Sequence, residues 1–201
     1  MRRQPSQDRA HATIDAVLKA AEHEIAQGGL DKLTTKRIAA TAGLSVGAVY
    51  EYFPNKETII SELIQRWLAR LFDELDSVHP RHGAGLDMLS YVTAQSERAI
   101  RLYEDQPGLG ALLDMLTAMP ALREVSEMHD NRVLDSVSSA LAHYLPRADP
   151  ADLRMTALSI LIISHEMISA AIVYQSGDPQ RLITNMRVCL IALVSRLLTP
   201  T

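Results

Sequence analysis

Residues 33–59 read LTTKRIAATAGLSVGAVYEYFPNKETI, and this stretch decides the fold of the N-terminal part of the chain. Thr34 and Ser45 are each placed to cap a short helix, because their side-chain oxygens can accept hydrogen bonds from the first turn. Gly43 lies between the two helices, where a tight turn favours a positive φ. The pattern predicts a helix–turn–helix whose second helix covers about Ser45–Tyr52.

Packing between these two helices is expected at Ala39 and Val49. The small side chain of Ala39 lets the helix backbones approach, and Val49 faces back into the same contact, with Phe53 beside it in the core. Many paired helices satisfy such a pattern, so by itself it leaves the function open. With Val49 in the core, the opposite face of the second helix is free for a partner.

The free face suits duplex DNA. A recognition helix presents its N-terminal residues to base edges in the major groove, and here those residues are small. Ser45 can hydrogen-bond, while Val46 and Ala48 can touch a thymine methyl group. Neighbouring hydroxyls, basic side chains and the N-terminus of the next helix suit phosphates. The predicted DNA-binding residues are Thr34, Thr35, Lys36, Arg37, Ser45, Val46, Gly47, Ala48, Tyr50, Tyr52, Asn55 and Lys56.

Structural roles for the same residues remain open at this stage. One of the two tyrosines can close a small core, Ser45 can be only a helix cap, and the basic residues can form an ordinary solvated face. Charge adds modest support for DNA: residues 1–56 hold 8 Lys and Arg against 6 Asp and Glu, whereas residues 57–201 hold 12 against 18. This asymmetry suggests a basic module attached to an acidic body.

Helical periodicity continues through the rest of the chain, and no segment has the pattern of a strand. We predict an all-α fold of about nine helices. The expected helices cover about 8–27, 34–42, 45–52, 55–78, 86–104, 109–118, 120–144 and 150–174, with a last one ending near 198.

Residues from about Arg9 to Ala69 resemble the DNA-binding domain of the TetR (tetracycline-repressor) family of bacterial transcription regulators. The resemblance is carried by Ile38-Ala39, Ala42-Gly43, Ser45-Val46-Gly47, Tyr50-Glu51-Tyr52-Phe53 and Lys56-Glu57, after the opening threonine. It implies a helix–turn–helix domain at 9–69 and a ligand-binding and dimerisation domain at 70–201. It further implies a homodimer on a palindromic double-stranded DNA operator. Val46 and Ala48 depart from the polar residues common in relatives, so the operator sequence cannot be derived from them.

Two stretches of the C-terminal part, 157–163 and 188–194, are apolar around the whole helix. Such helices must be covered on all sides, and a four-helix interface between two copies would cover them. A central core helix in a monomer is the alternative. The predicted dimer-interface residues are Ile160, Ile163, Met186, Cys189, Leu190 and Leu193.

A small-molecule pocket in the second domain is a further expectation, because the resemblance implies an effector and methionine adapts to apolar ligands. The same side chains can equally be ordinary core. The predicted pocket residues are Trp67, Met88, Tyr91, Tyr103, Met115, Met119 and Met167.

The function we predict is a DNA-binding transcriptional regulator, a repressor released by a small apolar effector. The alternatives are a DNA-binding activator without an inducer, a helical protein-interaction module and a small helical enzyme. No catalytic or cofactor motif and no metal-ligand spacing is present in the sequence, so we expect no enzyme activity, no cofactor and no metal site. The single cysteine, the charged N-terminus and the His165-Glu166 pair within the most apolar helix favour a cytoplasmic protein outside the membrane.

Overall fold

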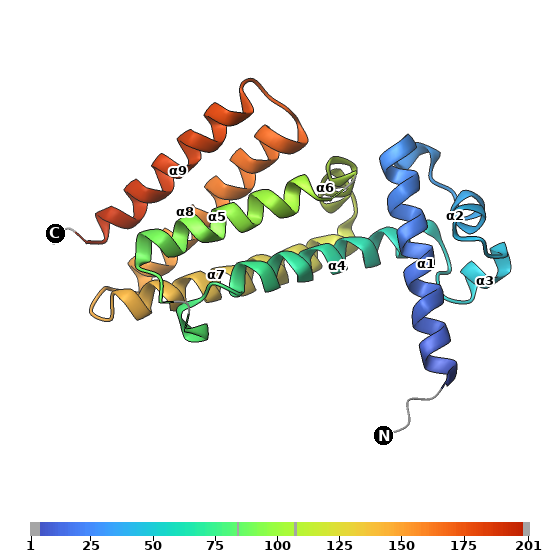
Figure 1. Cartoon of the computed structure of the whole chain (residues 1–201), viewed down its shortest axis with the longest axis horizontal. Coiled ribbons are helices and arrows are strands. Elements are labelled where there is room, and N and C mark those ends of the chain that lie inside the picture. The colour runs from blue at the N-terminus through green and yellow to red at the C-terminus, as the bar shows by residue number, and fades with distance from the viewer. Residues whose placement is uncertain (1–4, 84, 107, 199–201) are drawn as a thin grey trace. The chain divides into compact units, whose positions relative to one another are not determined.

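The computed structural model describes residues 5–83, 85–106 and 108–198, and within these ranges the chain is helical throughout (Figure 1). No strand occurs in the described ranges, and the all-α prediction of about nine helices is confirmed. The α-helices are α1 (Pro5–Gly28), α2 (Thr35–Ala42), α3 (Val46–Tyr50), α4 (Lys56–Asp76), α5 (Met88–Glu104), α6 (Leu109–Ala118), α7 (Pro120–Tyr144), α8 (Pro150–Ile168) and α9 (Pro179–Arg196). Short 3₁₀ turns lie at Leu30–Lys32 and Pro80–His82.

The chain divides into two compact units. Met1–Trp67 and Pro107–Leu122 make up the first, and Leu68–Gln106 and Arg123–Thr201 the second. The division therefore falls inside α4, close to the predicted boundary at residue 69. The grouping of α6 with the N-terminal helices was not predicted. It reflects a close approach, because a Cβ atom added at Gly108 would come within 2.6 Å of the Ile25 side chain.

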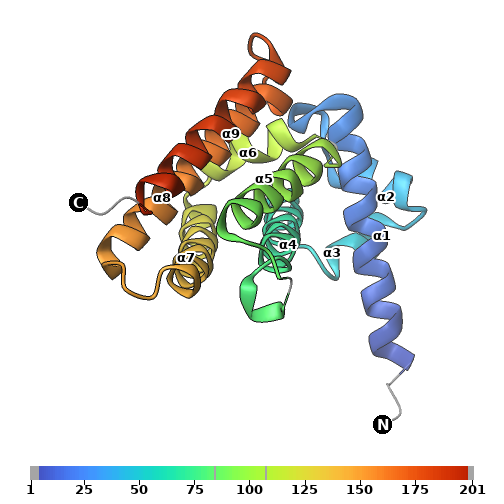
Figure 2. The same ribbon diagram turned by 60° about the vertical axis from the view of Figure 1, so that its left-hand side comes forward.

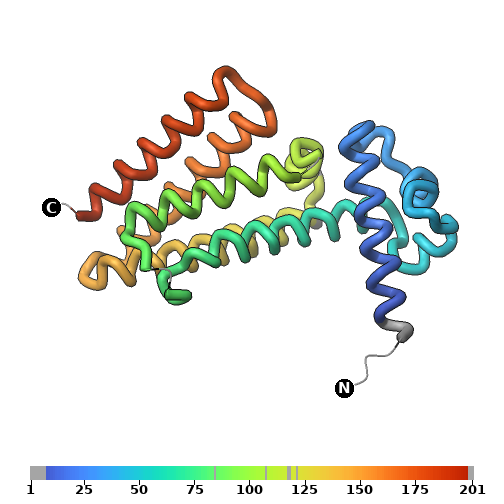
Figure 3. The backbone as a smooth tube through the Cα atoms, in the orientation of Figure 1, coloured from blue at the N-terminus to red at the C-terminus, as the bar shows by residue number. Residues whose placement is uncertain are grey.

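The first unit is built around one face of α1. Val17, Leu18, Ala21 and Ile25 are all buried, at the i, i+3, i+4 spacing of an amphipathic helix. α2 packs against this face, and α3 packs in turn on α2. Figure 3 shows how the backbone passes from α1 through the short helices α2 and α3 before α4 begins.

In the second unit, α8 packs along α9 and α5 (Figures 1 and 2). The contact buries Leu153, Ala157 and Ile160 of α8, and Met186 and Leu190 of α9. α8 ends at Ile168, six residues before the predicted end of this helix, and a π-helical turn continues it from Ser169 to Val173. In this turn the Tyr174 N–H donates to the Ser169 carbonyl at 3.0 Å, one residue further along than in an α-helix.

Pro150–Val173 is the one helical segment in the described ranges that is long and apolar enough to cross a membrane, by length and composition alone. A third of its most apolar window is buried inside the chain. Core helices of water-soluble proteins pass the same test, and this helix is packed against two others. We therefore describe it as a core helix with one uncovered face.

Candidate nucleic-acid interface

Local hydrogen bonds begin and end the two short helices where the sequence predicts. The Thr34 hydroxyl accepts the Arg37 N–H at 3.2 Å, and the Ser45 hydroxyl accepts the Ala48 N–H at 3.1 Å. Gly43 closes α2 with a φ of 69°, in the left-handed region that glycine adopts without strain. These three residues set the lengths of both helices and the turn between them.

The face of α3 that meets α2 is buried as predicted. Ala39 and Val49 are at most 1% exposed, and Phe53 is 5% exposed. Because Val49 holds one side of a five-residue helix in the core, the residues before it are turned outward. The orientation of α3 is thus decided by a single small contact.

The outward residues of α3 form a small, mostly apolar surface. Ser45, Val46 and Gly47 are exposed and Ala48 is half-buried, with 37% of Val46 accessible. A Cβ atom added at Gly47 would meet only the Ser45 hydroxyl, at 3.9 Å. Nothing in the described part of the fold requires a glycine at this position.

Hydroxyl groups and positive charge lie beside this surface. The hydroxyls of Thr35 and Tyr50 are 3.1 Å apart and share a hydrogen bond, which holds the half-exposed Tyr50 ring against the start of α2. One hydroxyl must donate to the other, so one proton remains for an outside acceptor such as a phosphate oxygen. Lys36 is exposed next to this pair, and Tyr52 is half-buried.

The start of α4 is organised by the side chain of Asn55. The Asn55 side-chain oxygen accepts hydrogen bonds from the Thr58 N–H and hydroxyl, both at 2.8 Å. Lys56 follows in the first turn and is half-buried. A capped helix N-terminus with an adjacent lysine is a suitable place for a phosphate.

Arg37 differs from its predicted role of supplying charge to a DNA backbone. Its guanidinium contacts Glu24 of α1 at 2.6 Å, and the Thr41 hydroxyl donates to the same carboxylate at 2.6 Å. The hydrogen bonds from Thr41 and Arg37 lower the pKa of Glu24. The charge of Arg37 is therefore balanced within the chain, and its side chain ties α2 to α1.

The contacts of Glu24 with Arg37 and Thr41 were not predicted, although the position of Glu24 in α1 pointed to a partner. Glu24 lies on the same face of α1 as the buried residues Ala21 and Ile25, and it is 8% exposed. A carboxylate at a core-facing position needs a partner, and the nearest basic helix supplies it.

The predicted pocket residues do not lie in one unit. Trp67, Met115 and Met119 belong to the first unit, and Met88, Tyr91, Tyr103 and Met167 to the second. Within the second unit, the Tyr103 hydroxyl contacts the His165 Nδ1 at 2.7 Å, so this histidine is satisfied by a neighbour. Tyr91 is fully buried, and its hydroxyl has no hydrogen-bond partner in the described part of the chain.

Three of the predicted dimer-interface residues are buried within a single chain. Ile160, Met186 and Leu190 are at most 5% exposed within a single chain, because they form the contact between α8 and α9. Ile163 and Leu193 are half-buried and Cys189 is exposed. The apolar residues that do face outward on these helices are Met155, Ile162, Val188 and Ile191, which are 42–62% exposed.

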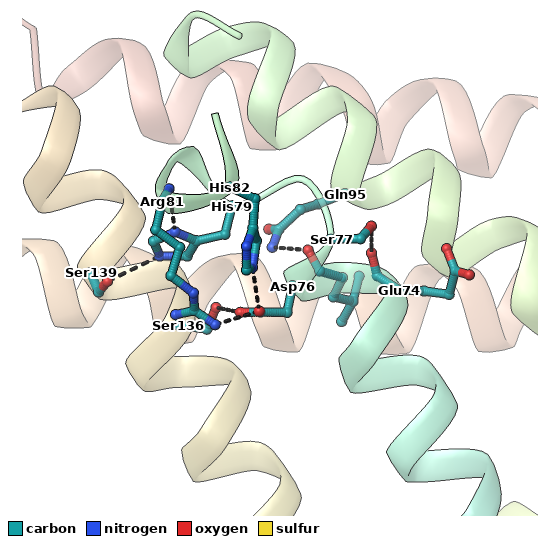
Figure 4. A network of polar contacts seen from close by, with 10 residues as sticks. Glu74, Asp76, Ser77, His79, Arg81, His82, Gln95, Ser136 and Ser139 are labelled. Carbon is teal, nitrogen blue, oxygen red and sulfur yellow. Dashed lines mark hydrogen bonds and ion pairs between the residues drawn. The ribbon is translucent and has the colours of Figure 1, made fainter. Parts of the chain in front are cut away.

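A polar network that the sequence did not reveal lies in the second unit, where α4 ends (Figure 4). Asp76, the last residue of α4, accepts a hydrogen bond from the Ser136 hydroxyl of α7 at 2.8 Å. It also pairs with Arg81 and contacts the His82 Nε2 at 3.0 Å. Burial acts to raise the pKa of Asp76, but the hydrogen bonds from His82 and Ser136 outweigh it and the pKa is lowered.

His79 continues this network. Its Nδ1 accepts the Arg81 N–H at 3.1 Å, so its Nε2 carries the proton and donates to the Ser139 hydroxyl at 3.0 Å. Burial and the charge of Arg81 lower the pKa of His79, which keeps the ring neutral. The network joins α4 and α7 within the second unit. Among the described side chains, no three potential metal ligands cluster here or elsewhere.

Comparison with known proteins agrees with this arrangement. The family model described as bacterial regulatory proteins of the tetR family matches residues 17–63, and the tetracyclin repressor-like C-terminal domain matches residues 88–192. The nucleoid occlusion factor SlmA of Pasteurella multocida is 37% identical over 60 residues, which are 29% of this chain and 30% of SlmA. The chain thus matches less than a third of the length of this curated relative.

Solved structures match over nearly the whole chain. The fatty acid degradation regulator FadR from Bacillus halodurans superimposes with a TM-score of 0.69 at 18% identity, covering 94% of this chain and 96% of FadR. SmeT, solved as a complex with triclosan, superimposes with a TM-score of 0.62 at 20% identity, covering 93% of this chain and 90% of SmeT. At these identities the two matches establish the fold alone.

Proposed function

The chain belongs to the tetR family of bacterial regulatory proteins, and on this premise we propose that it is a dimeric cytoplasmic repressor that leaves its operator when a small apolar effector binds. Members of this family are DNA-binding transcription regulators with a helix–turn–helix, and they are not enzymes. The helical-enzyme alternative is thereby removed. Operator contact, dimerisation and release by an effector are the parts of the proposal that need experiments.

The outward surface of α3 is the observation that carries the DNA-binding part of the proposal. Its small residues Ser45, Val46 and Gly47 allow close approach to base edges. Around them, Lys36, Lys56 and the paired hydroxyls of Thr35 and Tyr50 suit phosphates. We leave Arg37 out of this interface, because Glu24 already balances its charge.

The apolar stripe on α8 and α9 supports a dimer. Met155 and Ile162 are seven residues apart on α8, and Val188 and Ile191 are three apart on α9, so each pair lies on one helix face. The same stripe on a second copy would cover them around a two-fold axis. Such a dimer delivers two recognition helices, which a palindromic operator requires.

An effector site in the second unit is supported by two buried hydroxyls. Tyr91 on α5 and Thr156 on α8 are at most 1% exposed, and in the described part of the chain neither hydroxyl has a hydrogen-bond partner. Burying an unsatisfied hydroxyl is unfavourable, and a polar atom of a bound molecule would relieve this. SmeT, which shares the fold, has been solved with triclosan, a small molecule.

Selection of bound sequences from a random duplex library tests the proposal. We expect one palindromic motif, with binding that falls steeply as salt rises, because several phosphates per dimer release counterions. An effector that weakens operator binding must itself bind more weakly in the presence of operator, by the same factor. Absent or salt-independent duplex binding would favour a protein-interaction module instead.

A further inference from the structure

The outward surface of α3 has very little capacity to read bases by hydrogen bonding. We propose that this regulator recognises its operator through the C5-methyl groups of thymine, with Val46 as the methyl-contacting residue and Gly47 as the site of close backbone approach. The inference rests on the proposed function, because it concerns how α3 distinguishes one duplex from another. It commits to double-stranded DNA as the partner of this surface.

Few polar groups lie on the outward side of α3. The Ser45 oxygen already accepts the Ala48 N–H, so its hydroxyl offers an outside partner one proton and one remaining lone pair. Val46, Gly47 and Ala48 have no polar side-chain atoms. A hydroxyl that can both donate and accept finds a partner on every base in the major groove, so it discriminates poorly. The methyl group of thymine is the remaining feature that an apolar surface can read.

Val46 lies where a partner outside the chain can reach it. It is the first residue of α3 and 37% exposed, while Val49 on the other face supplies the contact with the core. A β-branched side chain has few rotamers in a helix, so its two methyl groups present a rigid surface. The fold does not need an apolar side chain here, whereas a thymine methyl group would pack against one.

Gly47 is a second residue of α3 whose identity the described part of the fold does not explain. Glycine inside a helix is destabilising relative to alanine, and here neither a positive φ nor a steric clash within the described part of the fold requires it. What a Cβ atom at this position would meet is a partner outside the chain. Gly47 therefore indicates that the partner approaches the backbone of α3 beside Val46.

Thymine-to-uracil substitution tests methyl reading directly, because it removes only the methyl group. In the duplex selected from the random library, each thymine is replaced in turn by deoxyuridine and the dissociation constant is measured. We expect a three- to fivefold loss for each methyl group that Val46 contacts, as for one buried methyl-sized group, and about tenfold or more when both half-sites are changed. Replacing the same T·A pair with C·G should weaken binding, and 5-methylcytosine·G should restore most of it.

Variants of Val46 assign the effect to this residue. Val46→Ala should bind thymine and uracil duplexes with nearly equal affinity. Val46→Thr, which keeps the shape and one of the two methyl groups, should keep part of the preference. A uracil effect that persists unchanged in Val46→Ala would overturn the proposal, because the effect would then arise from DNA shape or another residue. Equal binding of thymine and uracil duplexes by the parent protein would also overturn it. In both cases, salt-dependent binding to the selected duplex would still support the proposed function. Absence of any such binding would contradict both the proposed function and the reading of thymine methyl groups.

Gly47→Ala gives a second, independent readout. We expect its midpoint of thermal unfolding to stay the same or rise, while its affinity for the selected duplex falls at least tenfold. Ala48→Gly is the matched control, since it loosens the same helix while leaving the approach to the backbone open. Unchanged affinity in Gly47→Ala would contradict close approach at this position.

Discussion

The short helix α3 and the long helices α8 and α9 both leave apolar side chains in solvent, but the two surfaces differ in scale and surroundings. On α3 the apolar part is one valine beside a glycine, bordered by hydroxyls and lysines. On α8 and α9 it is a stripe of large side chains, each 42–62% exposed. Exposed apolar area alone therefore does not identify a partner. A small surface with a polar, basic border suits a nucleic acid, whereas a broad apolar stripe suits a second copy of the chain.

Two substitutions on α9 are expected to have the largest effects. They separate the buried face of this helix from its exposed face. Met186 is fully buried and Val188, two residues later, is 62% exposed. Met186→Glu should unfold the second unit, because an unpaired charge in the core costs more than about 4 kcal/mol. Val188→Glu should give a folded monomer with at least a hundredfold weaker operator binding. Circular dichroism and sedimentation separate the two outcomes, and a dimeric Val188→Glu protein would contradict the proposed interface.

Acid is expected to destabilise the second unit before the first. Burial, with the charges of Arg132 and His165, lowers the pKa of His129 to about 4. Below pH 6.5 the unfolded chain therefore binds a proton that the folded chain does not, so stability is complete above pH 6.5 and falls as the pH decreases toward 4. The loss from His129 should reach about 3 kcal/mol.

Urea unfolding between pH 7 and pH 4, followed through probes placed in each unit, measures this loss. The lowered pKa of His79 acts in the same direction as the pH falls below 6.5. His129→Gln removes the titrating ring and should flatten part of the pH dependence. A pH profile that is identical in His129→Gln and the parent protein would refute the assignment.

Two neighbouring basic residues on α2 should behave differently, although the sequence suggests the same role for both. Arg37→Ala leaves the carboxylate of Glu24 without its ion pair, so we expect the midpoint of thermal unfolding to fall by roughly a few degrees. Lys36→Ala should leave that midpoint unchanged and weaken duplex binding. Scanning calorimetry and a binding titration on both variants check this. The reverse pattern would return Arg37 to the DNA interface.

The smallest effect is expected at the start of α4. Lys56→Ala should weaken binding to all duplexes roughly alike, and it should reduce the slope of log affinity against log salt by about 2 per dimer. Lys19→Ala, on the exposed face of α1, is the control and should leave the slope unchanged. A sequence-dependent loss in Lys56→Ala would mean that this lysine contacts a base.

The helix–turn–helix was predictable almost residue by residue because its determinants are local. Thr34, Gly43 and Ser45 act on backbone groups within five residues of themselves, and the structure shows each of them doing so. Ala39 and Val49 are only ten residues apart, so their contact follows from the turn between them. The DNA-binding role of the outward residues remains a prediction, although their exposure agrees with it.

Ile160, Met186 and Leu190 were predicted at a dimer interface but are buried within one chain, and the reason lies in the sequence itself. A helix that is apolar on every side has no periodic signal to indicate which face turns inward. The sequence could therefore indicate these two helices, but not which of their residues face outward. The stripe that includes Val188 and Ile191 became visible only once α8 was placed against α9.

The helix–turn–helix, the all-helical character of the described residues and the resemblance to the tetR family could all be recognised from the sequence, because caps, turns and periodicity act over a few residues. Only the tertiary structure decided which side chains remain free: it committed Arg37 to Glu24, joined Asp76 to Ser136 across 60 positions, and turned Met186 inward and Val188 outward. The physical reason is that a side chain's availability depends on neighbours brought together by packing, and such neighbours leave no local pattern in the chain.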